Sequence, residues 1–145
     1  MAEVLRLFTA YVHRQPMREV EKTLALENRG LEGCLHGRTG SPRQVLLMDM
    51  ETLMDLGLSP GVVKENITTL GLGLYGLKEG QRLRIGEALL EVTVPCAPCH
   101  LMDLIRPGLQ QELRGRRGML SRVVGGGQIR RGDGIQVLDF MRVAS

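Results

Sequence analysis

The sequence predicts a single, mostly β domain, either a barrel or a sandwich of short strands with a few short helices. The chain has 145 residues, enough for one well-buried core, whereas two domains of half that size would each be marginal. Glycine accounts for 19 residues, well above its usual share of about 7%, and a glycine-rich chain with few long helical stretches is rich in turns. Helices do not alternate with strands along the chain, so βαβ units are not expected.

Alternating and continuous apolar runs predict the strands of the first half of the chain. These strands span residues 4–12, 19–27 and 45–48, with a further extended stretch at 62–67. Residues 30–42, with several glycines, form a loop. Helical spacing over residues 49–56 predicts a short helix, with Asp49 as its N-cap and Gly57 as its end.

Glycine and proline divide the second half of the chain into short elements. Residues 71–80 are expected to form a loop, and strands at 83–85 and 88–94 flank a tight turn at residues 86–87. Prolines within residues 95–98 end the second of these strands.

A helix is expected to begin near Cys99, to break at residues 107–108 (Pro-Gly), and to resume over residues 109–113. Three strands are expected after it, at residues 119–124, 128–130 and 135–141. Glycine-rich turns at residues 125–127 and 132–134 would join them as hairpins.

Composition and charge exclude several classes of partner. Aromatic residues make up 3% of the chain, which leaves little for stacking on single-stranded nucleic acid. The net charge is +3, and the excess lies in residues 103–145, which carry eight basic and four acidic side chains. Such a mild bias suits an anionic small molecule better than a nucleic-acid duplex, so no nucleic-acid partner is expected.

The N-terminal region has no signal-peptide pattern, and no apolar run is long enough to span a membrane. We therefore expect a cytoplasmic protein with no membrane partner. Three cysteines are an odd number, so in a reducing compartment a disulfide framework is not expected.

The spacing Cys96-x-x-Cys99 permits several chemistries. Followed by His100, it matches the attachment motif for c-type haem, but the missing export signal and the scarcity of aromatic residues argue against haem. A thioredoxin-like dithiol would open a helix early in a βαβ unit, whereas this pair lies two-thirds along a chain of antiparallel strands. Zinc remains an alternative, because Cys34-x-His36 would complete a set of four ligands.

Two further interpretations of the cysteines remain. Both could be buried as small hydrophobic side chains, although the flanking prolines and His100 make burial of the pair less favourable. The other is a reactive thiolate at Cys99, at a strand-to-helix turn near arginine side chains, that attacks sulfur, carries a persulfide or ligates a soft metal.

Several segments in order resemble the MOSC domain, the C-terminal part of molybdenum-cofactor sulfurases. They are Gly33-Cys34-Leu35-His36, Arg43-Gln44-Val45, Glu65-Asn66-Ile67-Thr68-Thr69, Pro98-Cys99, Arg116-Arg117-Gly118-Met119-Leu120-Ser121-Arg122-Val123 and Gly127-Gln128-Ile129-Arg130-Arg131-Gly132-Asp133. The likeness runs from about residue 30 to residue 137, so the whole chain, residues 1–145, is similar to a small stand-alone member with one domain.

The resemblance implies a closed or nearly closed β-barrel with a few short helices and one functional cysteine. Cys99 stands at the family's Pro-Cys position and Cys96 at a more variable one. The family is associated with molybdenum cofactor and with sulfur transfer, and in its amidoxime-reducing members the cysteine is a ligand of the molybdenum. Cys99 is thus the candidate catalytic residue and metal ligand.

Other residues qualify the resemblance. Cys34 stands where the family has an aspartate in its Gly-Asp-x-His segment, which puts a family-like activity in question. His36 on the same loop is a candidate catalytic proton donor or metal ligand, and the alternative is a histidine in a surface turn. Asn66 is a candidate for hydrogen bonding to a ligand, and the alternative is a cap on a turn.

Four arginines are candidates for binding the phosphate of an anionic pterin cofactor. Guanidinium groups bind phosphate in a bidentate manner, and six arginines against one glutamate lie between residues 112 and 131. For each arginine the alternative is a solvated surface side chain. The candidates are Arg43, Arg116, Arg117 and Arg122.

The leading hypothesis is a domain that binds molybdenum cofactor or carries sulfur, with Cys99 as its thiol and a sulfur-donor protein as a possible partner. The second is a molybdenum-dependent reductase of N-hydroxylated compounds. It would need a separate electron-donor protein, because the chain has no flavin or iron–sulfur motif. The third is a structural zinc module.

Overall fold

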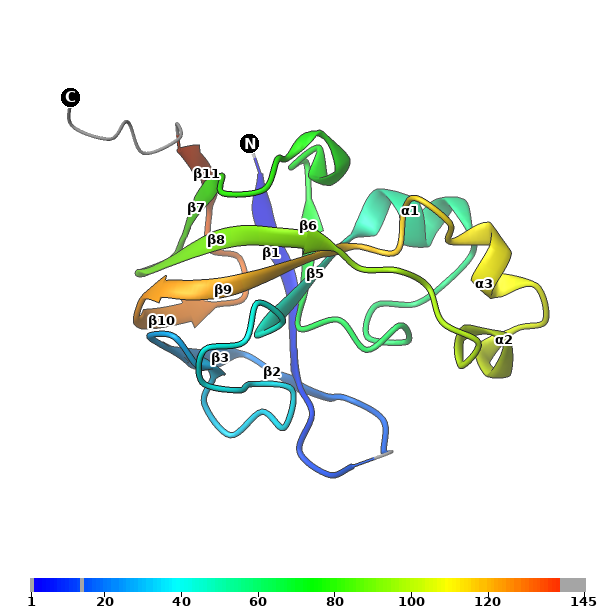
Figure 1. The fold of residues 1–145 in the computed structure, drawn as a ribbon, viewed down its shortest axis with the longest axis horizontal. Coiled ribbons are helices and arrows are strands. Elements are labelled where there is room, and N and C mark those ends of the chain that lie inside the picture. Colours follow the sequence, from blue (N-terminus) through cyan, green and yellow to red (C-terminus); the bar gives the residue numbers. More distant parts are fainter. Residues whose placement is uncertain (1, 14, 139–145) are drawn as a thin grey trace.

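Two sheets form the body of the fold (Figure 1). In the computed structural model, which describes residues 2–13 and 15–138, the strand order is β11-β7-β8-β9-β5-β6-β1-β2 in the larger sheet and β10-β3-β4 in the smaller. The strands are β1 Glu3–Thr9, β2 Arg18–Val20, β3 Lys22–Leu26, β4 Gly30–Leu31, β5 Val45–Asp49, β6 Ile67–Leu70, β7 Arg82–Ile85, β8 Ala88–Pro95, β9 Met119–Gly125, β10 Gly127–Arg130 and β11 Ile135–Leu138. The helices are α1 Met50–Asp55, the 3₁₀ helix η1 Leu74–Gly76, α2 Met102–Ile105 and α3 Leu109–Glu112.

The prediction of a mostly β fold with a few short helices is confirmed, but the barrel is not. Neither sheet closes on itself within the described residues. The larger sheet curves until the segment before β11 approaches β1, where Glu3 and Gly134 form one isolated bridge. A barrel needs a continuous ladder at every strand edge, and here β11 forms its ladder with β7.

Local sequence signals located several elements correctly. The Asp49 carboxylate accepts a hydrogen bond from the Thr52 amide at 3.1 Å and caps α1, and Gly57 after the helix has a φ of +67°. The strands β7 and β8 pair as the predicted antiparallel hairpin. The helical segment breaks at residues 107–108, between α2 and α3, as expected.

The predicted C-terminal hairpins are wrong. The glycines at residues 125–127 lead the chain from the larger sheet into the smaller one, because β9 pairs with β8 and β5 whereas β10 pairs with β3. The strand β11 likewise pairs with β7 and not with β10. Residues 139–141 of the third predicted strand lie outside the described residues.

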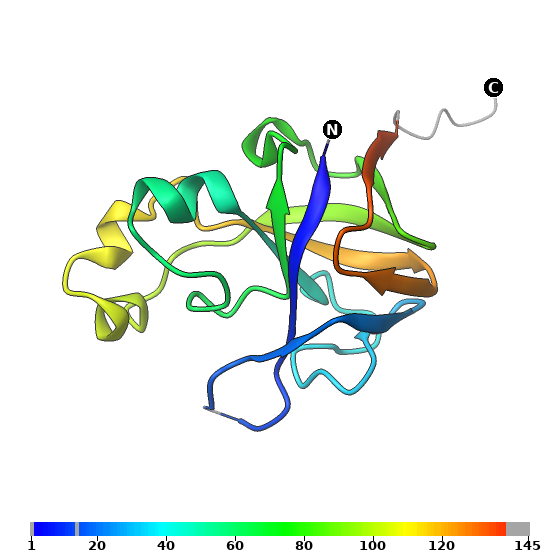
Figure 2. The same ribbon diagram turned by 180° about the vertical axis from the view of Figure 1, so that it is seen from behind.

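Two segments of the N-terminal half also differ from expectation. The single strand predicted at residues 19–27 is divided into β2 and β3, which belong to different sheets. The stretch predicted as extended at residues 62–67 begins as a turn and includes Lys64 with a φ of +68°, so β6 begins only at Ile67. Figure 2 shows β1 running along the body of the molecule, with β2 and β3 leading away from its lower end.

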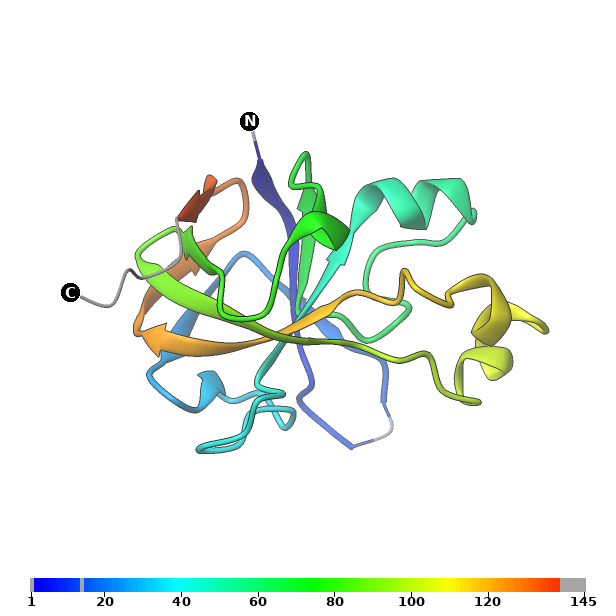
Figure 3. The same cartoon turned by 45° about the horizontal axis from the view of Figure 1, so that its top comes forward.

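Two hydrophobic clusters hold these elements together. The larger contains buried side chains from both sheets. The smaller fixes the lobe of short helices at one end of the sheet, which Figure 3 shows beside the ends of β8 and β9. It consists of Met48, Leu53, Val63, Met102, Leu109 and Leu113. No helix within the described part of the chain is long and apolar enough to cross a membrane.

Candidate functional site

Four segments that are distant in the sequence meet around the first residues of β5. The strands β5 and β6 are parallel neighbours, Leu46 of β5 lies opposite Leu120 of the antiparallel β9, and β8 ends where β9 begins. The Cys96 amide donates a hydrogen bond to the Gly118 carbonyl at 2.9 Å, which places the residues after β8 beside those before β9. The loop between β4 and β5 completes a cavity of about 410 Å³.

We call this space the basic cavity. It is lined by His13, Leu35, His36, Arg38, Ser41, Arg43, Gln44, Leu46, Lys64, Asn66, Cys96, Arg117 and Leu120. None of these lining residues is acidic, whereas four are lysine or arginine and two are histidine. A concave surface with one sign of charge attracts ligands of the opposite charge, so the cavity suits an anion.

Arg117 is the most constrained of the basic side chains. Only 6% of its surface is exposed. Its Nη2 donates to the Val63 carbonyl at 2.6 Å, but Nε and Nη1 are buried without a hydrogen-bond partner among the described residues. A buried cationic donor without a partner is costly, so an anion in the cavity that Arg117 lines would offset this cost.

The carboxyl of Glu65 is buried near Arg117. Burial raises the pKa of Glu65 above its ordinary value, although hydrogen bonds and the charge of Arg117 act in the opposite direction. Its Oε2 accepts a hydrogen bond from the Thr68 hydroxyl at 2.9 Å, while Oε1 has no partner among the described residues. Burial therefore disfavours the charged form of this carboxyl, and no ion pair joins it to Arg117 among the described residues.

Gly118 fixes the position of Arg117. Its φ is +103°, a conformation that side chains other than glycine rarely adopt. A Cβ atom at this position would also collide with the Leu47 carbonyl oxygen of β5. The chain therefore packs directly against β5 one residue after Arg117, and only glycine permits this approach.

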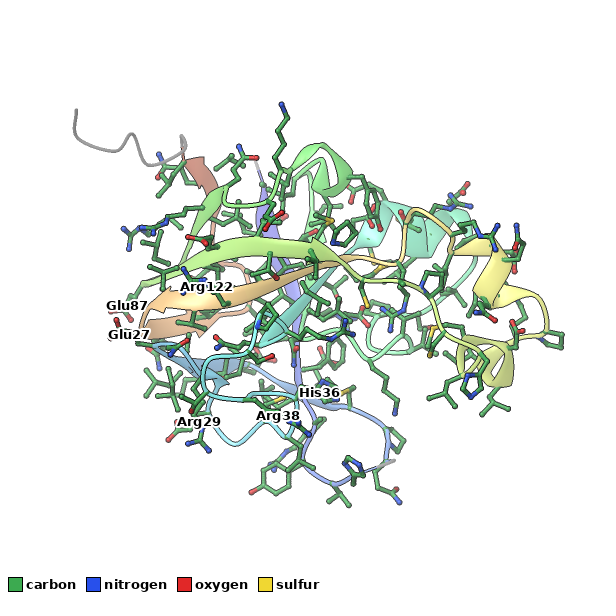
Figure 4. All side chains as sticks on the ribbon, viewed as in Figure 1. Glu27, Arg29, His36, Arg38, Glu87 and Arg122 are labelled. Carbon is green, nitrogen blue, oxygen red and sulfur yellow. The ribbon has the colours of Figure 1, made fainter. Side chains whose placement is uncertain are left out.

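His36 enters the cavity from the loop between β4 and β5, beside Arg38 (Figure 4). Burial is the largest cause that lowers the pKa of His36, and the charges of Lys64, His13 and Arg117 lower it further. Its imidazole is therefore held neutral at physiological pH, so it can both accept and donate a proton.

Cys34 anchors this loop to the sheet. Its sulfur accepts hydrogen bonds from the Ala10 amide and from Nδ2 of Asn66, both at 3.3 Å. The sulfur at the position where the resemblance places an aspartate thus serves these two donors as an acceptor.

Asn66 lies on the floor of the basic cavity, where its side chain is fully buried. Its Oδ1 accepts from the Leu46 amide at 2.9 Å, and Nδ2 donates to the Phe8 carbonyl at 3.2 Å as well as to Cys34. Both Nδ2 protons are used within the protein, so this amide joins β1, β5 and the loop and shapes the floor.

The structure brings His36, Arg43, Asn66 and Arg117 of the predicted site together, but not the other three residues. Arg116 pairs with Asp55 at 2.7 Å, and Arg122 pairs with Glu91 at 3.2 Å. Figure 4 shows Arg122 on β9, on the side of the molecule where Glu87 lies and well away from His36. Cys99 is exposed, precedes α2 and is not among the residues that line the cavity.

Sequence reasoning did not assign to the site four of the titratable residues of the basic cavity: Cys96, Lys64, Arg38 and His13. Cys96 follows a proline, as Cys99 does, and it stands directly after the end of β8. This position at a strand end was a usable signal. Lys64 had none, because its positive φ arises from a turn that the apolar pattern does not reveal.

The zinc hypothesis lacks its ligand cluster. Within the described residues, which include all three cysteines and His36, no group of three or more histidine, cysteine or acidic side chains is placed to hold a metal ion. The four side chains that this hypothesis requires are therefore not assembled.

Comparison with known families agrees with this architecture, since the MOSC domain matches residues 40–136. The chain belongs to the MOSC domain family. It is accordingly a molybdenum-cofactor-related domain. Comparison with curated proteins gave no match.

Solved structures share the MOSC fold of this chain. The YuaD protein from Bacillus subtilis has a TM-score of 0.80 at 21% identity, with 94% of each chain covered. YiiM from Geobacillus stearothermophilus has a TM-score of 0.77 at 18% identity, covering 96% of this chain and 76% of that one. YiiM from Escherichia coli has a TM-score of 0.69 at 22% identity, covering 97% and 71%. These likenesses extend the shared fold beyond the matched residues.

Proposed function

We propose that this MOSC domain binds molybdenum cofactor in the basic cavity and that Cys96 is the thiol that holds sulfur or ligates the metal there. The observation that carries the proposal is the buried guanidinium of Arg117, with two nitrogens that lack a partner among the described residues, in a cavity lined by a thiol and no carboxylate. Such a site suits an anionic ligand that also has an atom with affinity for sulfur.

The residues present fit the cofactor in chemical type. Arg38, Arg43 and Lys64 supply cationic donors suited to a phosphate, and Arg117 supplies donors deeper in the protein. The neutral imidazole of His36 is suited to moving a proton beside the bound group. When bound, the cofactor would supply a redox-active metal that accepts thiolate and sulfide ligands.

The choice between the two cysteines rests on position. The resemblance of Pro98-Cys99 to the family motif favours Cys99, whereas the cavity favours Cys96. The Cys96 backbone is hydrogen-bonded to Gly118, next to Arg117, whereas Cys99 is exposed. The place of Cys96 in the cavity wall, beside the segment that carries Arg117, therefore supports it as the thiol.

The test compares matched cysteine variants produced in a host that makes molybdenum cofactor. Molybdenum, releasable pterin and cyanide-labile sulfur are measured per chain for the wild type, Cys96→Ser and Cys99→Ser. We expect Cys96→Ser to lose most of the metal or the labile sulfur and Cys99→Ser to retain both. Dependence on Cys99 alone would overturn the assignment of the thiol, and dependence on neither cysteine would overturn the proposed function.

The reductase hypothesis would use the same thiol and the same cavity. Its separate requirement is an electron-donor protein, so the purified wild-type chain loaded with cofactor would reduce an N-hydroxylated substrate only when a donor is added. Loss of that reduction in Cys96→Ser, with Cys99→Ser active, would assign the activity to this site.

A further inference from the structure

We propose that a small anionic donor of sulfane sulfur reaches Cys96 through a second cavity on the other side of the thiol. This inference rests on the proposed function, since it names the source of the sulfur that Cys96 would carry. It concerns a space, of about 400 Å³, that the site described above does not use. We call this space the side cavity.

The side cavity shares two residues with the basic cavity. Cys96 and Arg117 line both spaces, so these two residues lie between them. The remaining polar lining comes from Tyr75, Gln110, Arg114 and the backbone of Gly115 and Gly118. A thiol between two cavities can react on one side while a cofactor occupies the other.

The lining of the side cavity also selects for negative charge. It is lined by Arg114 and Arg117, and none of its lining residues is acidic. Arg114 is exposed, and no ion pair to it is found among the described residues. An arginine without a carboxylate partner is available to attract and orient a small anion.

The other polar side chains of the side cavity hold its walls in place. The Tyr75 hydroxyl lies 2.7 Å from a carboxylate oxygen of Asp49 and 2.7 Å from the Arg116 carbonyl, which ties the segment before β9 to the N-cap of α1. The Gln110 side chain donates to the Pro98 carbonyl at 3.4 Å and joins α3 to the segment that carries Cys96. The two arginines are thus the groups left for a ligand.

The chemistry requires no additional oxidant. The Cys96 thiolate attacks the outer sulfur of a sulfane donor such as thiosulfate, a new S–S bond forms on Cys96, and the S–S bond of the donor breaks. Sulfite leaves with the electron pair of that bond, so the charges balance and Cys96 is left as a persulfide anion. Arg117, in the wall between the cavities, is placed to stabilise the anionic donor and the persulfide product.

The experiment uses thiosulfate as the probe and the full-length chain. Cyanide-labile sulfur and the mass of the peptide containing Cys96 are followed over time in the wild type, Cys96→Ser, Cys99→Ser, Arg114→Gln and Arg116→Gln. Arg116 is the control because it lies two residues after Arg114 in the sequence, is paired with Asp55 and lines neither cavity. We expect one added sulfur on Cys96, and a half-saturating thiosulfate concentration raised about tenfold in Arg114→Gln only.

The outcomes separate two claims, the side cavity as the route of the sulfur donor and the basic cavity as the cofactor site. An unchanged thiosulfate dependence in Arg114→Gln, or an equal change in Arg116→Gln, would overturn the side cavity as the route. Sulfur that accumulates on Cys99 in place of Cys96 would do the same. If Cys96 takes up no sulfur while molybdenum still depends on Cys96, the inference fails and the proposed function stands. If sulfur is loaded but no cofactor is bound, the proposed cofactor site fails instead.

Discussion

Two short segments lie side by side at the site, and each places one side chain inward and its near neighbour outward. In residues 95–99, Cys96 lines both cavities whereas Cys99 lines neither and is exposed. In residues 116–118, Arg117 is 6% exposed, whereas Arg116 has 37% of its side chain exposed and pairs with Asp55. Residues of one type in one segment therefore have different surroundings.

The comparison teaches that the number of basic residues in a segment does not measure the charge available to a ligand. Arg116 and Arg122 are offset by Asp55 and Glu91, which lie far away in the sequence. Arg117 has a carbonyl partner and no carboxylate within ion-pairing distance among the described residues. The available positive charge at the cavity is therefore set by which arginines the fold leaves without an acidic partner.

The largest expected effect on stability comes from a substitution at Gly118, which holds Arg117 inward and follows the outward-facing Arg116. Gly118→Ala would combine a strained positive φ with a collision against the Leu47 carbonyl, and we expect it to lower the free energy of unfolding by about 3 kcal/mol. Gly115→Ala is the matched control, because Gly115 also has a positive φ but no atom lies near its Cβ position. It should cost about 1 kcal/mol.

Urea unfolding of both glycine variants measures the difference between them. Equal losses of stability would show that the contact between Gly118 and β5 does not hold the segment, and the inward position of Arg117 would then need another cause.

A smaller effect, opposite in sign for the two arginines, should follow from replacing each by methionine. In buffer without polyvalent anions, Arg117→Met removes an under-paired buried charge, and we expect the free energy of unfolding to rise by about 1 kcal/mol. Arg116→Met breaks a partly exposed ion pair and should lower it by at most about 1 kcal/mol.

Sulfate, added as a probe anion, should act in the opposite direction on the relative stabilities of these proteins. The wild type and Arg116→Met should gain thermal stability with sulfate concentration, because the ligand binds the folded state. Arg117→Met should gain much less. A similar gain in all three proteins would mean that sulfate binds elsewhere, and the unpaired nitrogens of Arg117 would no longer support an anion site.

Much of the fold could be predicted from local signals, and the part that could not depends on distant partners. The cap at Asp49 and the hairpin turn at residues 86–87 lie within the elements that they define. Glycines at residues 125–127 identify a turn but not the sheet that receives the next strand, which depends on β3 about a hundred residues earlier in the chain.

The same limit applies to the site. His36 and Arg117 could be singled out by residue type and order, and both line the basic cavity. The exclusion of Arg116 follows from Asp55, which is 61 residues away and which no local pattern associates with it. The preference for Cys96 over Cys99 follows from the register of β8 against β9, which a single sequence does not contain.

The smallest effect concerns pH and tests whether the inward side chains act on one another. Burial lowers the pKa of His36 from its ordinary 6.5, with contributions from Lys64, His13 and Arg117, so the folded state without ligand binds a proton less readily than the unfolded chain. The stability of the chain without ligand should therefore decrease as the pH falls through 6.5. A bound sulfate acts in the opposite direction and raises the pKa of His36, so binding takes up a proton.

The affinity for sulfate should accordingly increase a few-fold when the pH falls from about 7.5 to about 5.5, a range over which sulfate itself does not titrate. Arg38 and Arg43 also line the cavity and contribute to the affinity for sulfate. Calorimetric titration of the wild type, His36→Gln and His13→Gln measures the slope of the sulfate affinity against pH. His36→Gln should remove most of it and His13→Gln a smaller part, because His13 is exposed. A slope that survives in His36→Gln would show that the imidazole does not sense the anion, and the basic cavity would then bind through its fixed charges alone.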